Sequence, residues 1–308
     1  MRNKKVFLIG SRQSPLAKEQ TKIVVKKLKL IGIENIKVKY ILSKGDTFTH
    51  KKFKDAGGKG LFTNELDKLV LNREIDIAVH SSKDIPSYIS RGLEISAFLK
   101  RENPRDVLVT RRSGIIKIED IPHGSIFGSS SPRRISYIKH YRPDIIIKNL
   151  RGNIDTRIKK VYEGKVFATL LAQAGLARLK SKNYKINLRV VPLSKILPAP
   201  GQGVIAIMQR RDNEHLKKKL KLIDHKKTRL IISAERELIK EIKGDCFTPI
   251  GVYANIEKAC LKIRARLFST DGLKYVEVRK TSCAMDAKHL GRQCAKEILS
   301  KIKFKFKK

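Results

Sequence analysis

Apolar and polar residues alternate with two different periods along the first hundred residues. Residues 5–10 and 36–42 form short apolar or alternating runs, which predict strands. Between them, Ser14 and Pro15 predict the start of a helix, because serine is a good N-cap and proline suits the first helical position. A second amphipathic stretch, over residues 61–72, predicts another helix. This order of elements is typical of an α/β domain.

The apolar run at residues 77–79 predicts a short, fully buried strand. Small polar residues follow it, then Lys83 and Asp84, and Pro86 stops regular structure from continuing. A buried strand that opens into such a loop is a usual place for chemistry in α/β proteins. We interpret Asp84 as the chemical centre. An ordinary strand end with a solvated Lys–Asp pair is the alternative.

The pattern of the first strand and helix repeats further along the chain. Residues 125–128 predict a strand, and Ser131 and Pro132 again predict a capped helix start. GSRQSP at residues 10–15 and GSSSP at residues 128–132 both place backbone N–H groups and an arginine beside a helix N-terminus, which suits an anion. Further strands are predicted at residues 145–148 and 167–171. We interpret this as a weak internal repeat, which predicts two similar α/β domains.

The last part of the chain has a different order of elements. A long helix is predicted over residues 226–243, then strands near 249–256, 260–268 and 274–280, and a final helix over 286–301. This order predicts a small α+β domain. The PAPGQG segment at 198–203 is a hinge that could return the chain from the second domain to the first. We predict three domains: residues 1–100 with 202–221, residues 105–198, and residues 226–308.

Charge is the most unusual feature of the composition. The 308 residues include 69 Lys and Arg against 29 Asp and Glu, a net charge of +40. Such a charge attracts polyanions, including nucleic acid, acidic membranes and acidic metabolites. The lysines are scattered over predicted helix faces, so a solvated surface with a lysine bias is the simpler interpretation. No nucleic-acid-binding motif is present, and aromatic residues, at 6%, are not clustered for base stacking.

The cysteines and the first apolar run of the sequence indicate the cellular compartment in which we expect the protein. The four cysteines, at positions 246, 260, 283 and 294, have no CxxC pairing or regular spacing. We therefore expect neither a zinc site nor a disulfide framework, in keeping with a reducing cytoplasm. The apolar run at residues 6–9 is too short for a signal peptide or a membrane span. We expect a cytoplasmic monomer with no required nucleic-acid or membrane partner and no metal.

Arginines follow the predicted strands or open helices beside Gly, Ser or Asn. The planar guanidinium binds carboxylates through paired hydrogen bonds, so these positions predict anion recognition; solvated helix ends are the alternative. Lys59 lies in GGKG, which lacks the spacing of a nucleotide P-loop, so it is either a solvated hinge lysine or a cation that reaches over an anion. The arginines concerned are Arg12, Arg133, Arg134, Arg151, Arg157 and Arg178.

A series of motifs in a fixed order resembles the porphobilinogen deaminase (hydroxymethylbilane synthase) family. The resemblance runs from about residue 12 to residue 251. Its motifs are SRQSPLA, GGKGLFTNEL, DIAVHSSKDIP, ENPRD, GSSSPRR, LRGNIDTR, LAQAGLARL, LPAPGQG and GDCFTPIG. Any one of these would be weak evidence, whereas the whole series in this order is specific.

The resemblance implies a fold, a reaction and a cofactor. The fold would comprise two α/β domains similar to periplasmic binding proteins and a smaller third domain. The reaction would be head-to-tail condensation of four porphobilinogen molecules with release of ammonia, then hydrolytic release of hydroxymethylbilane, a step of tetrapyrrole and heme biosynthesis. The cofactor would be dipyrromethane, joined to Cys246 by a thioether. A rival interpretation is a two-lobed anion-binding protein without catalysis.

The resemblance also implies roles for individual residues. Asp84 would be catalytic, stabilising the cationic azafulvene that forms as porphobilinogen loses ammonia. Asp245 departs from the small residue usual before the cofactor cysteine, and we expect it to slow cofactor attachment. Cofactor binding would involve Lys83, Ser81, Ser130, Ser131, Arg133, Arg134 and Arg157; substrate binding would involve Arg12, Ser14, Arg151, Arg178, Gln202 and Lys59, the last in a mobile lid.

Overall fold

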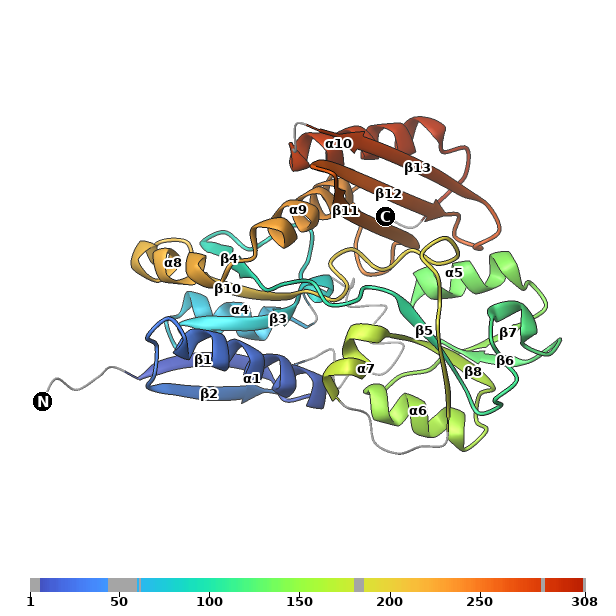
Figure 1. The fold of residues 1–308 in the computed structure, drawn as a ribbon, viewed down its shortest axis with the longest axis horizontal. Coiled ribbons are helices and arrows are strands. Elements are labelled where there is room, and N and C mark those ends of the chain that lie inside the picture. The colour runs from blue at the N-terminus through green and yellow to red at the C-terminus, as the bar shows by residue number, and fades with distance from the viewer. Residues whose placement is uncertain (1–5, 44–59, 61, 180–185, 284–285, 307–308) are drawn as a thin grey trace, which may run out of the picture. The chain divides into compact units, whose positions relative to one another are not determined.

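The computed structural model describes residues 6–43, 60, 62–179, 186–283 and 286–306 (Figure 1). The chain forms two compact units, residues 1–102 with 204–230 and residues 103–203 with 231–308. The 198–203 segment therefore ends in the second unit and is followed by a return to the first, as the sequence predicts. The division into three domains at the boundaries given above stays a prediction.

The first unit is built on a five-stranded sheet in the order β2-β1-β3-β10-β4. The first three strands are parallel, and β10 is antiparallel to both of its neighbours. Ile9, Ile77 and Ile207 are fully buried in its core. The elements are β1 (Phe7–Arg12), α1 (Pro15–Lys29), β2 (Ile36–Ile41), α4 (Asn64–Leu71), β3 (Ile77–Ser81), η1 (Ser82–Asp84), β4 (Leu93–Phe98), β10 (Ile205–Arg210), α8 (Glu214–Leu220) and η3 (Lys221–Ile223).

The second unit contains a sheet of the same design, in the order β7-β6-β8-β5-β9. Strands β7, β6 and β8 are parallel, and β5 is antiparallel to both β8 and β9. The repeat predicted from the two strand–helix joins is therefore present in the topology. The elements are β5 (Asp106–Thr110), η2 (Ile118–Asp120), β6 (Ile126–Gly128), α5 (Pro132–Tyr141), β7 (Ile146–Lys148), α6 (Ile154–Tyr162), β8 (Ala168–Ala172), α7 (Gln173–Leu179) and β9 (Asn187–Val190).

A smaller antiparallel sheet, β11-β12-β13, completes the second unit, with α10 packed against β12 and β13 (Figure 1). The rings of Tyr137, on α5, and Phe268, on β12, lie 4.7 Å apart, and Arg266 donates to the hydroxyl of Tyr141 at 3.0 Å. The α/β fold class with a small C-terminal sheet domain is confirmed. The remaining elements are α9 (Lys226–Glu241), which begins in the first unit and continues in the second, β11 (Ile250–Glu257), β12 (Cys260–Phe268), β13 (Tyr275–Ser282) and α10 (Ala287–Lys301).

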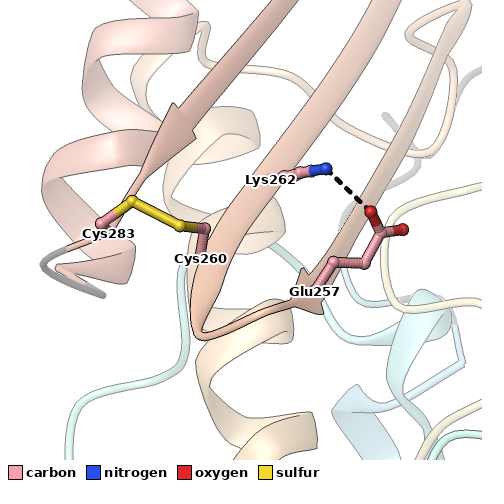
Figure 2. The surroundings of a disulfide bond; sticks show 4 residues. All are labelled: Glu257, Cys260, Lys262 and Cys283. Carbon is pink, nitrogen blue, oxygen red and sulfur yellow. Dashed lines mark hydrogen bonds and ion pairs between the residues drawn. A yellow bond between two sulfur atoms is a disulfide. The ribbon is translucent and has the colours of Figure 1, made fainter.

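The expectation of no disulfide was wrong, because Cys260 and Cys283 are joined in the small sheet (Figure 2). Leu261 pairs with Ser282 across β12 and β13, so the next facing positions are the two cysteines, whose Cα atoms lie 4.2 Å apart. A separation of 23 residues between two cysteines does not by itself predict that they form a disulfide. The pairing depends on strand register, which cysteine spacing alone does not show. Cys246 and Cys294 are free thiols.

Candidate active site

In the first unit, Arg12 and Asp84 meet at the carboxyl ends of β1 and β3. Arg12 is the last residue of β1, and Asp84 ends the short helix η1 that follows β3. Arg12 Nη1 lies 3.3 Å from Asp84 Oδ2, and the side chains are 18% and 24% exposed. The Arg12 guanidinium also lies over the Phe62 ring, 4.4 Å from its centroid. Asp84 is therefore a held but accessible carboxylate, suited to a cationic or N–H-donating ligand.

The other predicted residues of this unit differ in how they are placed. Ser14 Oγ accepts a hydrogen bond from Ala17 N at 3.3 Å, so the predicted N-cap is confirmed. Ser81 exchanges hydrogen bonds with the buried amide of Gln20, a residue that sequence reasoning missed. Lys83 is exposed beside Asp84. Lys59 lies outside the described residues.

A buried acid and imidazole lie behind this loop. Asp67, on α4, and His80, on β3, are both almost fully buried, with Oδ1 and Nε2 3.7 Å apart. Burial and the charge of Arg12 lower the pKa of His80 to about 3, so its imidazole is neutral at pH 7. Burial raises the pKa of Asp67 from 3.8 to about 6. Neither residue was singled out as functional from the sequence, although His80 precedes Ser81.

We expect the substitution Asp67→Asn to stabilise the protein at pH 8 and not at pH 3.5. The folded protein holds the Asp67 proton more tightly than the unfolded chain, so stability falls as pH rises from about 4 to about 6. Removing the ionisable group removes this penalty, worth up to about 3 kcal/mol. Chemical denaturation of both proteins across this pH range measures it. Exposed Asp212 provides the control, Asp212→Asn, and a gain that does not depend on pH would contradict the assignment.

In the second unit, Arg133 and Arg134 lie at the start of α5 and share one buried carboxylate. Asp106 Oδ2 lies 2.7 Å from Arg133 Nη1, and Oδ1 lies 2.8 Å from Arg134 Nη2. Burial alone would raise the pKa of Asp106, but the two guanidinium charges outweigh it and hold that pKa below its ordinary value. Neither arginine Nε has a hydrogen-bond partner among the described residues. The pair is thus held by Asp106, and Arg133 Nη1 also donates to Leu197 O at 2.7 Å.

Three guanidiniums crowd together in the same unit. Burial first, and then the charges of Arg134 and Arg151, lower the pKa of Arg157 to about 10. Burial also lowers the pKa of Arg151. Arg157 Nε donates to the carbonyl of Gly152 at 2.8 Å, which orients the group without neutralising it. An anionic ligand would relieve this like-charge repulsion.

Other predicted residues of the second unit support the backbone of the site. Ser130 Oγ contacts Leu150 O at 2.8 Å. Ser131 is the N-cap position of α5, but its side chain makes no capping hydrogen bond, and its N–H donates to Ser129 Oγ at 3.2 Å. Arg178 Nη2 donates to Gly203 O at 2.7 Å. Gln202 is 1% exposed, and its Nε2 donates to Asp106 Oδ1 at 3.1 Å.

Cys246 lies in a turn between α9 and β11, and it is exposed. The neighbouring Asp245 carboxylate is directed into the turn itself. Its Oδ1 accepts from Phe247 N at 2.8 Å and from Thr248 Oγ1 at 3.3 Å, and Asp245 N donates to Thr248 Oγ1 at 2.9 Å. Asp245 therefore shapes the turn that presents the thiol, a role that sequence reasoning missed.

Metal-binding clusters and membrane-spanning helices are both absent from the described residues. Among the described residues, no group of His, Cys, Asp and Glu could hold a metal ion. Within the same residues, no helix combines the length and apolar character needed to cross a membrane.

Solved structures resemble the chain at low similarity. The periplasmic VFT2 domain of Bordetella pertussis BvgS matches with a TM-score of 0.43 and 14% identity, covering 70% of this chain and 85% of that one. An ancestral arginine-binding protein matches with a TM-score of 0.38 and 14% identity, covering 78% and 93%.

Sequence comparisons are far more specific. Two family models match: "Porphobilinogen deaminase, dipyromethane cofactor binding domain" over residues 7–218 and "Porphobilinogen deaminase, C-terminal domain" over residues 230–300. Porphobilinogen deaminase of Nitrobacter winogradskyi is 37% identical over 97% of this chain and 94% of its own length. That of Brevibacillus brevis is 40% identical over 95% and 93%. The chain therefore belongs to the porphobilinogen deaminase family.

Proposed function

We propose that this chain condenses four porphobilinogen molecules head to tail, releases ammonia at each step, and finally releases hydroxymethylbilane by hydrolysis. Its family makes it a transferase of tetrapyrrole biosynthesis with a dipyrromethane cofactor. The observation that carries the proposal for this chain is the exposed Cys246 thiol, which belongs to the same compact unit as the crowded guanidiniums. A thiol for attachment and a cationic cluster for carboxylates are the two features that such a cofactor needs.

The residues of the second unit fit the cofactor chemically. Each pyrrole ring carries acetate and propionate groups, and guanidinium groups bind carboxylates through paired hydrogen bonds. We assign the cofactor and chain carboxylates to Arg133, Arg134 and Arg157, with Arg151 and Arg178 toward incoming substrate. When bound at Cys246, dipyrromethane supplies the pyrrole carbon to which the first substrate unit is added. Ser130 and Ser131 would add hydrogen bonds at the start of α5.

The residues of the first unit would act on the incoming substrate. As ammonia leaves porphobilinogen, positive charge develops on the ring and its methylene group. A carboxylate fixed beforehand stabilises that charge without having to reorganise, and it can also accept hydrogen bonds from pyrrole N–H groups. Asp84, held 3.3 Å from Arg12, has this role in our proposal. Arg12 and Ser14 would bind substrate carboxylates near it, as would Lys59 and, from the second unit, Gln202. Ser81 and Lys83 would bind the cofactor.

We further propose that the protein is a cytoplasmic monomer of three domains. Attachment of the cofactor requires Cys246 as a free thiol, and a reducing compartment keeps such an exposed thiol available. The same reducing compartment would also reduce the Cys260–Cys283 disulfide to two thiols, because Cys283 is exposed. The state of those two cysteines in protein alkylated at cell lysis therefore tests the compartment directly.

We expect the denatured protein to carry the added mass of two linked pyrrole units, and the Cys246→Ser variant to lack it. Intact-mass measurement of both proteins checks this, after incubation with porphobilinogen if the purified protein is bare. Cys294→Ser, which changes the buried free thiol, is the matched control and should retain the added mass. If the mass stayed unchanged after incubation, or remained in Cys246→Ser, attachment at Cys246 would be refuted.

A further inference from the structure

Glu235 is a fully buried carboxylate on α9 that connects two separate backbone segments. Its Oε2 accepts a hydrogen bond from Gly201 N at 2.7 Å, and its Oε1 accepts one from Ala254 N at 2.8 Å. Ala254 lies on β11, the strand that follows the Cys246 turn. Gly201 lies in the 198–203 segment, where its positive φ of 73° forms a tight turn. Glu235 thus fixes two backbone segments, one next to Gln202 and the other on the strand that follows Cys246.

The turn held by Glu235 carries Gln202 to the carboxylate of the arginine pair. Gln202 Nε2 donates to Pro104 O at 2.6 Å and to Asp106 Oδ1 at 3.1 Å. Asp106 Oδ1 is also the oxygen that Arg134 contacts at 2.8 Å. A shift of the turn would therefore move a donor away from the oxygen that orients Arg134.

The arginine pair depends on this carboxylate for its direction. Arg133 and Arg134 are 4% and 6% exposed, and each is joined to Asp106 through one terminal nitrogen. A guanidinium presents its donors in a rigid fork, so the position of one contact sets where the others point. A small rotation of the Asp106 carboxylate would therefore change the geometry offered to a ligand carboxylate.

We propose that Glu235 is a positioning residue for ligand binding by Arg133 and Arg134. It fixes the turn at Gly201, the turn places Gln202 against Asp106, and Asp106 directs the two guanidiniums. The inference rests on the proposed role of these arginines in binding pyrrole carboxylates. It adds that one buried side chain, Glu235, fixes the positions of both the 198–203 segment and β11, the strand that follows the Cys246 turn.

Glu235→Gln is the sharpest test, because it keeps size and changes one acceptor into a donor. The new amide group faces a backbone N–H, so one of the two contacts is lost. We expect the bare protein to acquire its dipyrromethane cofactor about tenfold more slowly, while the KM of the loaded enzyme for porphobilinogen changes by less than about threefold, because misplaced Arg133 and Arg134 weaken binding of the cofactor carboxylates. The cofactor mass should be retained. Glu237→Gln is the matched control, because Glu237 lies on the same helix but pairs with Arg292 on α10 at 3.1 Å.

A double-mutant cycle separates positioning from loss of stability. If Glu235 acts through Gln202, then Glu235→Gln should slow cofactor loading little beyond the effect of Gln202→Ala. Additive effects, or equally slow loading in Glu237→Gln, would overturn the proposal. If Glu235→Gln does not fold, a normal loading rate in Gln202→Ala overturns it instead. Arg134→Gln serves as the reference: a normal loading rate there refutes the proposed arginine role, whereas slow loading there with a normal Glu235→Gln refutes only the positioning role.

Discussion

Asp84→Asn is expected to lower the rate of elongation by about 10²- to 10³-fold, while the fold and the covalent cofactor are retained. The amide has nearly the same shape as the carboxylate but carries no charge to oppose the cation that develops as ammonia leaves. Asp84 and Arg12 are both only partly buried, and Arg12 is the last residue of β1, so the fold does not depend on this pair. Single-turnover addition of porphobilinogen to the loaded enzyme measures the effect.

Two further variants separate charge from simple disturbance of the loop. Asp84→Glu keeps the charge and moves it by one methylene group, so we expect an intermediate rate. Arg12→Lys keeps the neighbouring positive charge but loses the planar fork, and it should raise the KM for substrate more than it lowers kcat. Near-normal elongation by Asp84→Asn would remove this carboxylate from the centre of the mechanism.

The parts of the fold that follow from local pattern were predictable. The buried strand at 77–79 and the helix that starts at Pro15 depend on residues close in sequence, and the structure contains both. The hydrogen bond of Ser14 to Ala17 N shows why such a signal works, because cap and helix lie within three residues. The repeated strand–helix join likewise predicted two similar sheets.

The contacts that define the site were not predictable, because they join residues far apart in the chain. Asp106 enters the sequence analysis only as the last residue of the ENPRD motif, yet it is the buried partner of Arg133 and Arg134, 27 and 28 residues away. The positions of the arginines indicated that they bind anions. They could not show that one of these anions is the carboxylate of Asp106, within the same protein. The Cys260–Cys283 pair was missed for the same reason, since it depends on the register of two strands.

Asp106→Asn is expected to lower the free energy of unfolding at pH 7 by about 3–5 kcal/mol, more than any other single substitution considered above. The carboxylate is fully shielded and is the charge partner of two guanidiniums that are themselves buried. Asparagine offers one acceptor oxygen and turns an amide donor toward the other arginine. The variant thus leaves buried positive charge uncompensated, which costs far more than the loss of a surface pair.

The pH dependence of this loss gives a second, independent check. The pKa of Asp106 is held below its ordinary value of 3.8 in the fold, so its stabilisation is present above that pH and is lost as pH falls toward the folded-state pKa. The wild-type protein should therefore lose its advantage over Asp106→Asn below about pH 4, as denaturant titrations at several pH values would show. Asp144→Asn is the control, because Asp144 pairs with Arg142 at 2.6 Å but is partly exposed, and its loss should be smaller. An equal decrease in the free energy of unfolding in the two variants would mean that the burial of Asp106 adds nothing to the stability of its ion pairs. Contacts other than Asp106 would then orient Arg133 and Arg134.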